Sequence, residues 1–207
     1  MSLNLLDIIK KRRSIREYLP REVSRDVLLR ILDATRWAPS AHNAQPWRFV
    51  IIRERGLKRE FAEAMADEWV KDMTRDEVPP ETRESLAEAS IKQFIHAPVL
   101  IVACVTMEDM DKYQDRRRRE CEHVMAVQSL AAAIQNILLT AHSEGLGACW
   151  FCAPLFCQDI VRKVLKMPGD VEPQALVMLG YPSGKPSPPP RKRIEEIAHE
   201  NYWGEEL

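Results

Sequence analysis

Apolar residues spaced three and four positions apart predict several amphipathic helices. A short helix is expected over Leu3 to Lys11, and a longer one runs from Ser24, a favourable N-cap, to Trp37. Further helices are expected over residues 56–72 and 158–166. The charged segment 71–88 contains Pro79 and Pro80, and we expect it to be a mobile loop that leads into another helix.

Runs of β-branched and aromatic residues predict strands between these helices. The segment W-R-F-V-I-I at 47–52 is one, and the continuous apolar run A-P-V-L-I-V-A-C-V at 97–105 is typical of a strand buried on both faces. Two more are expected at 147–151 and 174–180. The chain is therefore expected to combine a buried central sheet with surrounding helices.

The longest helical pattern covers residues 120–144 and ends at Gly145, a residue favoured after a helix C-terminus. It is apolar on more than one face, and Ala131, Ala132 and Ala133 allow close contact with another element. Because one chain is not expected to cover all of these faces, the pattern predicts a homodimer. Residues 124–142 also contain Gln, Ser, Asn and Thr, which we interpret as too polar for a membrane span.

Composition is that of a soluble globular protein, with 45% hydrophobic and 29% charged residues in 207 positions. The formal net charge of −1 gives no overall field for nucleic acid or an anionic membrane. The N-terminus places its basic residues after its apolar ones, the reverse of a secretory signal, so a cytoplasmic location is expected.

Three polar segments have the composition of a binding site. The loop from Trp37 to Val50 carries Asn43 and Gln45, whose amides could read a planar heterocycle, although an ordinary connecting loop is the alternative. Near the N-terminus, Arg12, Arg13, Ser14 and Arg16 are suited to a phosphate, with a solvated helix end as the alternative. A proline-rich stretch at 182–190 leads to a second basic cluster at 191–193.

Four motifs in order resemble the nitroreductase family of flavin enzymes: R-R-S-I-R-E-Y at 12–18, A-P-S-A-H-N-A-Q-P-W at 38–47, G-L-G-A-C-W at 145–150 and L-G-Y-P at 179–182. The resemblance covers nearly the whole chain. It implies an α+β fold of α-β-α layers around a central mixed, largely antiparallel sheet. It also implies a single domain over residues 1–207, with an extended C-terminal arm, 182–207, exchanged in a homodimer.

The resemblance also implies which residues hold FMN. The phosphate would be bound by Arg12, Arg13, Ser14, Arg191 and Arg193, and Arg16 would approach the pyrimidine end of the ring. The flavin of the other subunit would be contacted by Pro39, Ser40, Ala41, Asn43 and Gln45. The redox face would meet the segment Cys152, Ala153, Pro154 and Leu155; since proline has no N–H, the backbone donor would be Ala153 or Leu155.

The implied activity is transfer of hydride from NAD(P)H through FMN to an electron-poor acceptor such as a nitroaromatic compound or a quinone. No side chain need act as acid or base, because the cofactor carries the chemistry. The segments C-A-P-L-F-C and E-P-Q-A-L-V-M-L-G-Y-P also resemble the reductase domain associated with deazaflavin-coenzyme biosynthesis, so reduction of such a precursor is one alternative. A flavin-binding protein without turnover is another.

Cysteine and histidine spacing gives little support to a metal or thiol site. Cys149 and Cys152 form a C-x-x-C within a strand-like run, where residues three apart face opposite sides, so buried structural thiols are favoured over a redox pair or zinc site. The five histidines show no ligand spacing, and no metal is expected.

Four arginines, Arg116 to Arg119, precede the predicted long helix. We expect Arg117 and Arg118 to attract an anionic substrate or the NADPH phosphate at the substrate entrance, with pairing to neighbouring Asp and Glu residues as the alternative.

Overall fold

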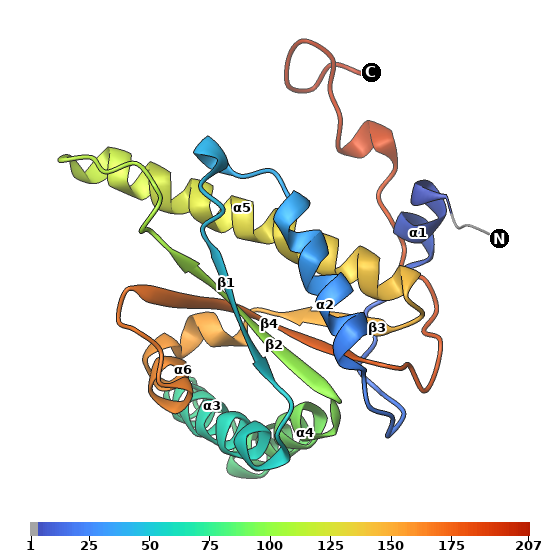
Figure 1. Ribbon diagram of the computed structural model, residues 1–207, viewed down its shortest axis with the longest axis vertical. Helices are drawn as coiled ribbons and strands as arrows, with labels where there is room; N and C mark the ends of the chain where they lie inside the picture. Colours follow the sequence, from blue (N-terminus) through green and yellow to red (C-terminus); the bar gives the residue numbers. More distant parts are fainter. Residues whose placement is uncertain (1–3) are drawn as a thin grey trace.

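The computed structural model describes residues 4–207 and has helices on both faces of a central sheet (Figure 1). The predicted start of the first helix at Leu3 lies outside the described residues. The helices are α1 (Leu5–Lys11), α2 (Arg25–Asp33), α3 (Arg55–Arg75), α4 (Pro80–His96), α5 (Arg116–Ser143) and α6 (Gln158–Leu165). The strands are β1 (Trp47–Ile52), β2 (Val99–Thr106), β3 (Gly147–Phe151) and β4 (Val171–Gly180). Short 3-10 helices are η1 (Ala34–Trp37), η2 (Ala41–Asn43), η3 (Ala153–Phe156) and η4 (Ile194–Glu196).

The sheet has the order β1-β2-β4-β3, and each neighbouring pair of strands is antiparallel. Every residue of β2 is buried, which confirms the prediction of a central strand from its continuous apolar run. The expectation of a mixed sheet is wrong for these four strands. Parallel pairing occurs in the described residues as an isolated bridge between Ser14 and Ala148.

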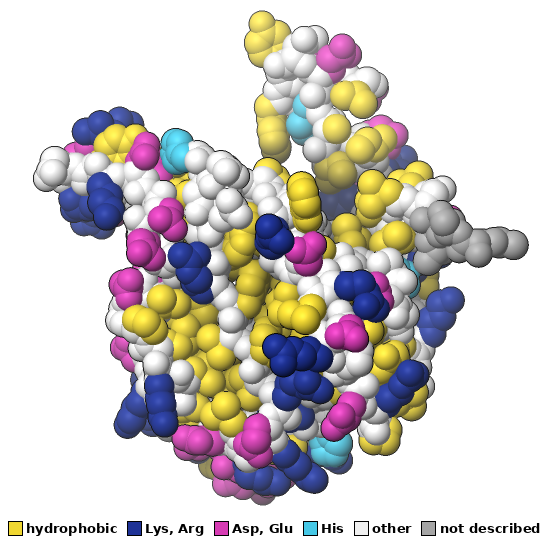
Figure 2. All heavy atoms as spheres, viewed as in Figure 1, with side chains coloured by type: hydrophobic (Ala, Val, Ile, Leu, Met, Phe, Trp, Pro, Cys, Tyr) yellow, Lys and Arg dark blue, Asp and Glu magenta, His cyan; other side chains and the backbone are white. Residues whose placement is uncertain are grey.

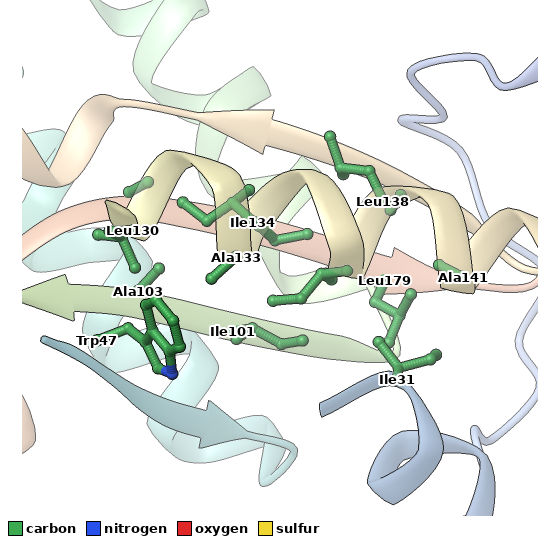
Figure 3. Close-up of a cluster of buried hydrophobic side chains, with 14 of the residues drawn as sticks. Ile31, Trp47, Ile101, Ala103, Leu130, Ala133, Ile134, Leu138, Ala141 and Leu179 are labelled. Carbon is green, nitrogen blue, oxygen red and sulfur yellow. The ribbon is translucent and has the colours of Figure 1, made fainter. Parts of the chain in front are cut away.

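Helix α5 crosses one face of this sheet beside α2 (Figure 1). Leu130, Ile134 and Leu138 from α5 meet Ile101 and Leu179 from the strands (Figure 3). Ile134 is 1% exposed, so truncating such a side chain to alanine would cost about 2–5 kcal/mol of unfolding free energy. This packing explains the apolar pattern of the long helix.

By length and composition α5 could cross a membrane, since an 18-residue window reaches a mean hydropathy of 1.5. The expectation that its polar residues exclude a span is therefore wrong on composition alone. In the structure, however, 44% of that window is buried, and its apolar residues pack on the sheet as those of a core helix do.

The opposite face is covered by α3, α4 and α6 (Figure 1). Phe61 of α3 and Phe94 of α4 pack against Leu100, Val102 and Met178 of the sheet. Trp69 follows the buried residues Phe61 and Met65 at four-residue intervals along α3, but it is 41% exposed. Its position therefore requires an explanation other than core packing.

Two helix boundaries differ from the prediction. The expected mobile loop at 71–88 is mostly helix, because α3 continues to Arg75 and α4 begins at Pro80. Proline is favoured in the first helical turn, where its missing N–H needs no partner, so Pro80 starts a helix here. Helix α5 begins at Arg116 and not at residue 120, because the Asp115 carboxylate caps it by accepting from the Arg118 N–H at 3.0 Å.

The remaining boundaries are close to the predicted ones. Residues 34–37 of the second predicted helix tighten into η1, Cys152 follows β3 instead of belonging to it, and β4 begins at Val171. Ser24 caps α2 as predicted, accepting from the Val27 N–H at 3.3 Å.

After Pro182 the chain leaves the sheet and stays exposed (Figure 1). In this arm, residues 182–207, the named secondary structure is the short helix η4. Ile194, Ile197 and Trp203 are 54%, 61% and 93% exposed, and yellow side chains are visible along the arm in Figure 2. Its apolar residues therefore have little to pack against within one chain.

Candidate active site

The N-terminal motif lies along an edge of the sheet. The Ile15 N–H donates to the Ala148 carbonyl at 3.0 Å, and the Leu19 N–H donates to the Tyr181 carbonyl at 2.8 Å. A third bond joins the Ser183 N–H to the Glu17 carbonyl at 3.2 Å. Backbone pairing thus brings together three of the four sequence motifs, R-R-S-I-R-E-Y, G-L-G-A-C-W and L-G-Y-P.

Two glycines of these motifs are explained by the same close approach. A Cβ atom on Gly147 would lie 2.5 Å from the Ile15 Cβ, and one on Gly180 would lie 2.8 Å from the Tyr18 Cδ1 and 2.6 Å from the Pro98 Cδ. All of these distances are too short for real carbon contacts, so only glycine lets the N-terminal segment sit this close to the strands.

A positive cluster forms where α1 meets the C-terminal end of α5. Burial lowers the pKa of His142 below its ordinary value, and the charges of Arg12, Arg13, Lys185 and Lys11 lower it further. Arg12 and Arg13, which the sequence identified as phosphate ligands, are thus together, with Ser14 next in the chain and exposed. Lys185 was missed, because it sits in a proline-rich stretch where only the basic run at 191–193 stood out.

A cavity of about 1200 Å³ adjoins this edge, between the segment Arg16 to Tyr18, helices α3 and α4, and η3. The Arg16 guanidinium carbon lies 5.8 Å from the centre of the Phe151 ring, at the border of the cavity. Most of the remaining cavity surface is apolar and includes Trp69, Phe94 and Phe156, although Glu68, Asp72 and Asp76 also line the cavity. Trp69 is therefore half-exposed because it faces this cavity.

The segment Cys152 to Leu155 reaches the cavity through Ala153. The Leu155 N–H already donates to the Cys152 carbonyl at 3.0 Å, closing the turn of η3. Pro154 is buried and has no N–H to offer. Of the two donors left open by the sequence, Ala153 is the one whose residue lines the cavity.

The loop before β1, residues 38–46, is called the polar loop here, and within one chain it does not reach this cavity. It lies against α5, with the Ala41 N–H donating to the Ser129 hydroxyl at 3.2 Å, on the sheet face opposite to α3 and α4. The Ser40 hydroxyl holds the Gln45 N–H at 3.1 Å, and the Asn43 and Gln45 side chains are exposed. Pro39 is also exposed.

The backbone of this loop is strained. His42, Asn43 and Gln45 have φ angles of 54°, 55° and 49°, in the left-handed region that most non-glycine residues avoid. Such conformations cost of order 1–3 kcal/mol each and are concentrated at functional sites.

The remaining predicted ligands are not gathered at the cavity. Arg191 and Arg193 lie on the exposed arm, where Arg193 faces Glu195 and Glu196. The four arginines lie in the first turn of α5, not before it, and none of them lines the cavity. Arg118 pairs with Asp115 and lies over the Tyr113 ring, and Arg116 pairs with Glu120. Arg116 and Arg118 therefore make the local ion pairs that were the alternative to substrate binding.

All five cysteines are free thiols. Cys149 is buried in the core beneath α3, and burial raises its pKa, whereas Cys152 is exposed beyond the end of β3. A buried, poorly ionised thiol beside an exposed one does not form the paired geometry of a thiol-redox site.

Comparison with known proteins identifies the family to which this fold and these motifs belong. The model of the nitroreductase family matches residues 9–181. A protein from Methanothermobacter thermautotrophicus with the provisional name NADH dehydrogenase/NAD(P)H nitroreductase is 32% identical over 189 residues, which are 89% of this chain and 80% of the relative.

Solved structures agree with this result. The BluB-like flavoprotein from Clostridium difficile 630 superposes with a TM-score of 0.76 at 28% identity, covering 95% of this chain and 98% of the other. An NADPH:FMN oxidoreductase from Vibrio harveyi, complexed with NAD+, has the same fold, with a TM-score of 0.74 at 19% identity over 97% of this chain and 78% of its own. The chain therefore belongs to the nitroreductase family of oxidoreductases.

Proposed function

We propose that the protein is an FMN-dependent oxidoreductase that passes hydride from NAD(P)H to an electron-poor acceptor and works as a homodimer. The observation that carries this proposal is the pairing of the N-terminal motif with the ends of β3 and β4. That pairing sets a cluster of cations at one end of the motif and Arg16, at the edge of a large apolar cavity, at the other.

The donor chemistry of this edge suits FMN. Arg12 and Arg13 supply planar guanidinium donors for a phosphate dianion, and the neighbouring Ser14 adds a hydroxyl. Lys185 adds a cation that also acts on His142. The cationic cluster at Arg12 and the apolar cavity at Arg16 are only a few residues apart along the chain. FMN likewise has a charged phosphate at one end and a planar, largely apolar ring system at the other.

When bound, FMN would supply the two-electron chemistry, accepting a hydride equivalent and returning it. The residues of the chain would bind, orient and shield. Arg16 would stabilise negative charge at the pyrimidine end, as a cation placed where charge develops. The Ala153 N–H would donate to the ring, and Trp69, Phe94 and Phe156 would keep water from the reacting face.

A second subunit would complete the site. The polar loop and the basic end of the arm are the two predicted ligand groups that one chain does not bring to its own cavity. Large apolar side chains are exposed on α1, η1 and the arm, including Leu5 (66%), Trp37 (79%) and Trp203 (93%). Burial of this surface between two chains would stabilise the dimer and deliver Asn43 and Gln45 to the partner's flavin in the same step.

The acceptor would be planar and electron-poor, such as a nitroaromatic compound or a quinone. Aromatic side chains line the cavity, and its volume of about 1200 Å³ exceeds that of most small-ligand sites. The names of the relatives, which mention NADH, NAD(P)H and nitroreductase activity, support this class of donor and acceptor.

A visible spectrum and a turnover assay test this proposal together. The purified protein, or the protein reconstituted with FMN, should show flavin absorbance, and NAD(P)H should be oxidised steadily when a quinone or nitroaromatic acceptor is added. Flavin absorbance without turnover would instead support a flavin-binding protein. Failure to bind FMN would contradict the main proposal.

A further inference from the structure

Three side chains from distant parts of the sequence meet on the α5 side of the sheet. The His42 Nε2 lies 3.4 Å from the Glu122 Oε1 and 3.8 Å from the Asp111 Oδ2. One donor atom from each residue lies within 4.8 Å of the donor atoms of the other two. The cluster joins the polar loop, the connection that follows β2, and the body of α5.

Glu122 is the unusual member, because it is a buried acid. Its residue is only 3% exposed, and its Oε2 atom has no hydrogen-bond partner among residues 4–207. Burying a carboxylate oxygen without a partner is costly, and native structures seldom leave one so. The His42 ring contacts the other oxygen, so the Glu122 Oε2 atom still lacks a partner among the described residues.

The spacing of the donors fits a metal ion. Bonds of about 2.0–2.1 Å in a tetrahedral site put neighbouring donor atoms roughly 3.3–3.5 Å apart. The His42–Glu122 distance already has this value, the His42–Asp111 distance exceeds it by a few tenths of an ångström, and the Asp111–Glu122 distance is at most 4.8 Å. The His42 and Asp111 side chains are 45% and 56% exposed, so both are free to close by that amount.

The chemical types of the three donor atoms indicate which class of metal ion would bind. One imidazole nitrogen with two carboxylates suits divalent first-row metals such as zinc or manganese better than calcium or magnesium, which prefer oxygen alone. Two of the four arginines at the start of α5 are partly neutralised, since Arg116 pairs with Glu120 and Arg118 with Asp115, and Arg119 donates to the Gln114 carbonyl. Local repulsion of a cation is reduced accordingly.

We propose that His42, Asp111 and Glu122 bind one divalent first-row transition-metal ion, with solvent completing its coordination. The ion would fasten the polar loop to α5 beside the bond between the Ala41 N–H and the Ser129 hydroxyl. It would also compensate the buried charge of Glu122. The proposal does not depend on flavin binding, because none of the three residues is among the proposed flavin ligands and the metal is tested alone.

Titration with zinc tests the site directly. The protein is treated with EDTA, desalted and titrated with ZnCl₂ by calorimetry, and its thermal midpoint is recorded with and without the ion. We expect one ion per chain and a higher midpoint in zinc. His42→Asn and Asp111→Asn should each weaken binding at least tenfold and abolish the rise in the midpoint. Asparagine tolerates the left-handed φ of residue 42, so His42→Asn removes the ring without adding strain.

Asp109→Asn is the matched control, since Asp109 is an exposed acid of the same connection and faces Arg48 instead of His42. It should bind zinc as the unchanged protein does. Glu122→Gln should lose the ion while keeping the shape of the buried side chain, and circular dichroism verifies that each variant is folded. Equal zinc affinity in the unchanged protein and in His42→Asn and Asp111→Asn would overturn the proposal and leave an ordinary histidine–carboxylate cluster.

Discussion

The N-terminal motif and the polar loop are both predicted to contact flavin, but they are fixed in opposite ways. The N-terminal motif is held by backbone pairing with the sheet and borders a large cavity in its own chain. The polar loop lies on the other side of the sheet with a strained backbone, and its amide side chains face solvent. Under the proposed function, the N-terminal motif would form one half of the flavin site within its own chain, and the polar loop would form the other half only when a second chain is bound.

Gly147→Ala should have the largest effect, because it separates the N-terminal motif from β3. The added methyl group would lie 2.5 Å from the Ile15 Cβ, and such overpacking typically lowers the unfolding free energy by about 1–3 kcal/mol. FMN affinity should fall with it, since Arg12 and Arg16 would shift. Gly169→Ala, which meets no atom within 4 Å, should change stability little. Chemical denaturation and FMN titration of both variants check this.

Arg12→Ala should weaken FMN binding by about 10- to 100-fold while leaving the fold intact, because a charge-assisted bond to phosphate would be lost. Arg36→Ala is the control, since Arg36 is also an exposed arginine but pairs with Asp33 away from the cluster. Fluorescence titration with FMN measures both. Equal affinity in the two variants would remove Arg12 from the phosphate site.

The sequence predicted the helices and strands better than it predicted which site residues lie close together in the folded chain. Local patterns were sufficient for β2, with its unbroken apolar run, and for the cap at Ser24. They misjudged segment 71–88, where charge and proline suggested a loop although Pro80 starts a helix. The sequence predicted Arg16 and Ala153, which line the cavity, but the spacing of Trp69 is that of a core residue, and only packing shows that Trp69 faces the cavity.

Contacts between residues far apart in the chain could not be predicted from sequence patterns. His42, Asp111 and Glu122 show no ligand spacing along the chain, and only the folding of the loop onto α5 brings them together. Resemblance to the family implied Arg12, Ser14 and Asn43 as site residues, but periodicity alone gave no reason to place the loop of Asn43 near Ser129 of α5 and Arg12 near His142, at the C-terminal end of the same helix. The structure adds that reason.

Asn43→Gly should loosen FMN by about tenfold without destabilising the chain. The substitution removes one amide hydrogen-bonding group, and glycine adopts the φ of 55° more readily than asparagine does. Asn43→Ala also removes the amide, but alanine adopts the left-handed φ less readily than asparagine or glycine, so comparison of the two variants separates loss of the contact from a change in backbone conformation. Unchanged FMN affinity in both would show that the loop does not contact the cofactor.

The smallest effect is expected on the titration of His142. Burial, followed by the charges of Arg12 and Arg13, lowers its pKa in the folded protein, so the unfolded chain binds more protons at acidic pH. Its contribution to stability should therefore be present above the unfolded pKa of about 6.5 and be lost as the pH falls below it. A bound phosphate would offset the arginine charges and raise the pKa. NMR titration with and without FMN measures this, with His123, which pairs with Glu172, as the internal control.

Mixing two variants with weakened FMN binding tests the shared site most directly. Subunits carrying Arg12→Ala are unfolded, refolded together with subunits carrying Asn43→Gly, and assayed for tight FMN binding and NAD(P)H oxidation. If each flavin lies between the N-terminal motif of one chain and the polar loop of the other, half of the dimers are mixed and each contains one intact site. About a quarter of all sites should then recover full affinity. If both groups served the flavin of their own chain, every site would carry a substitution, and the absence of any recovery would contradict the shared site.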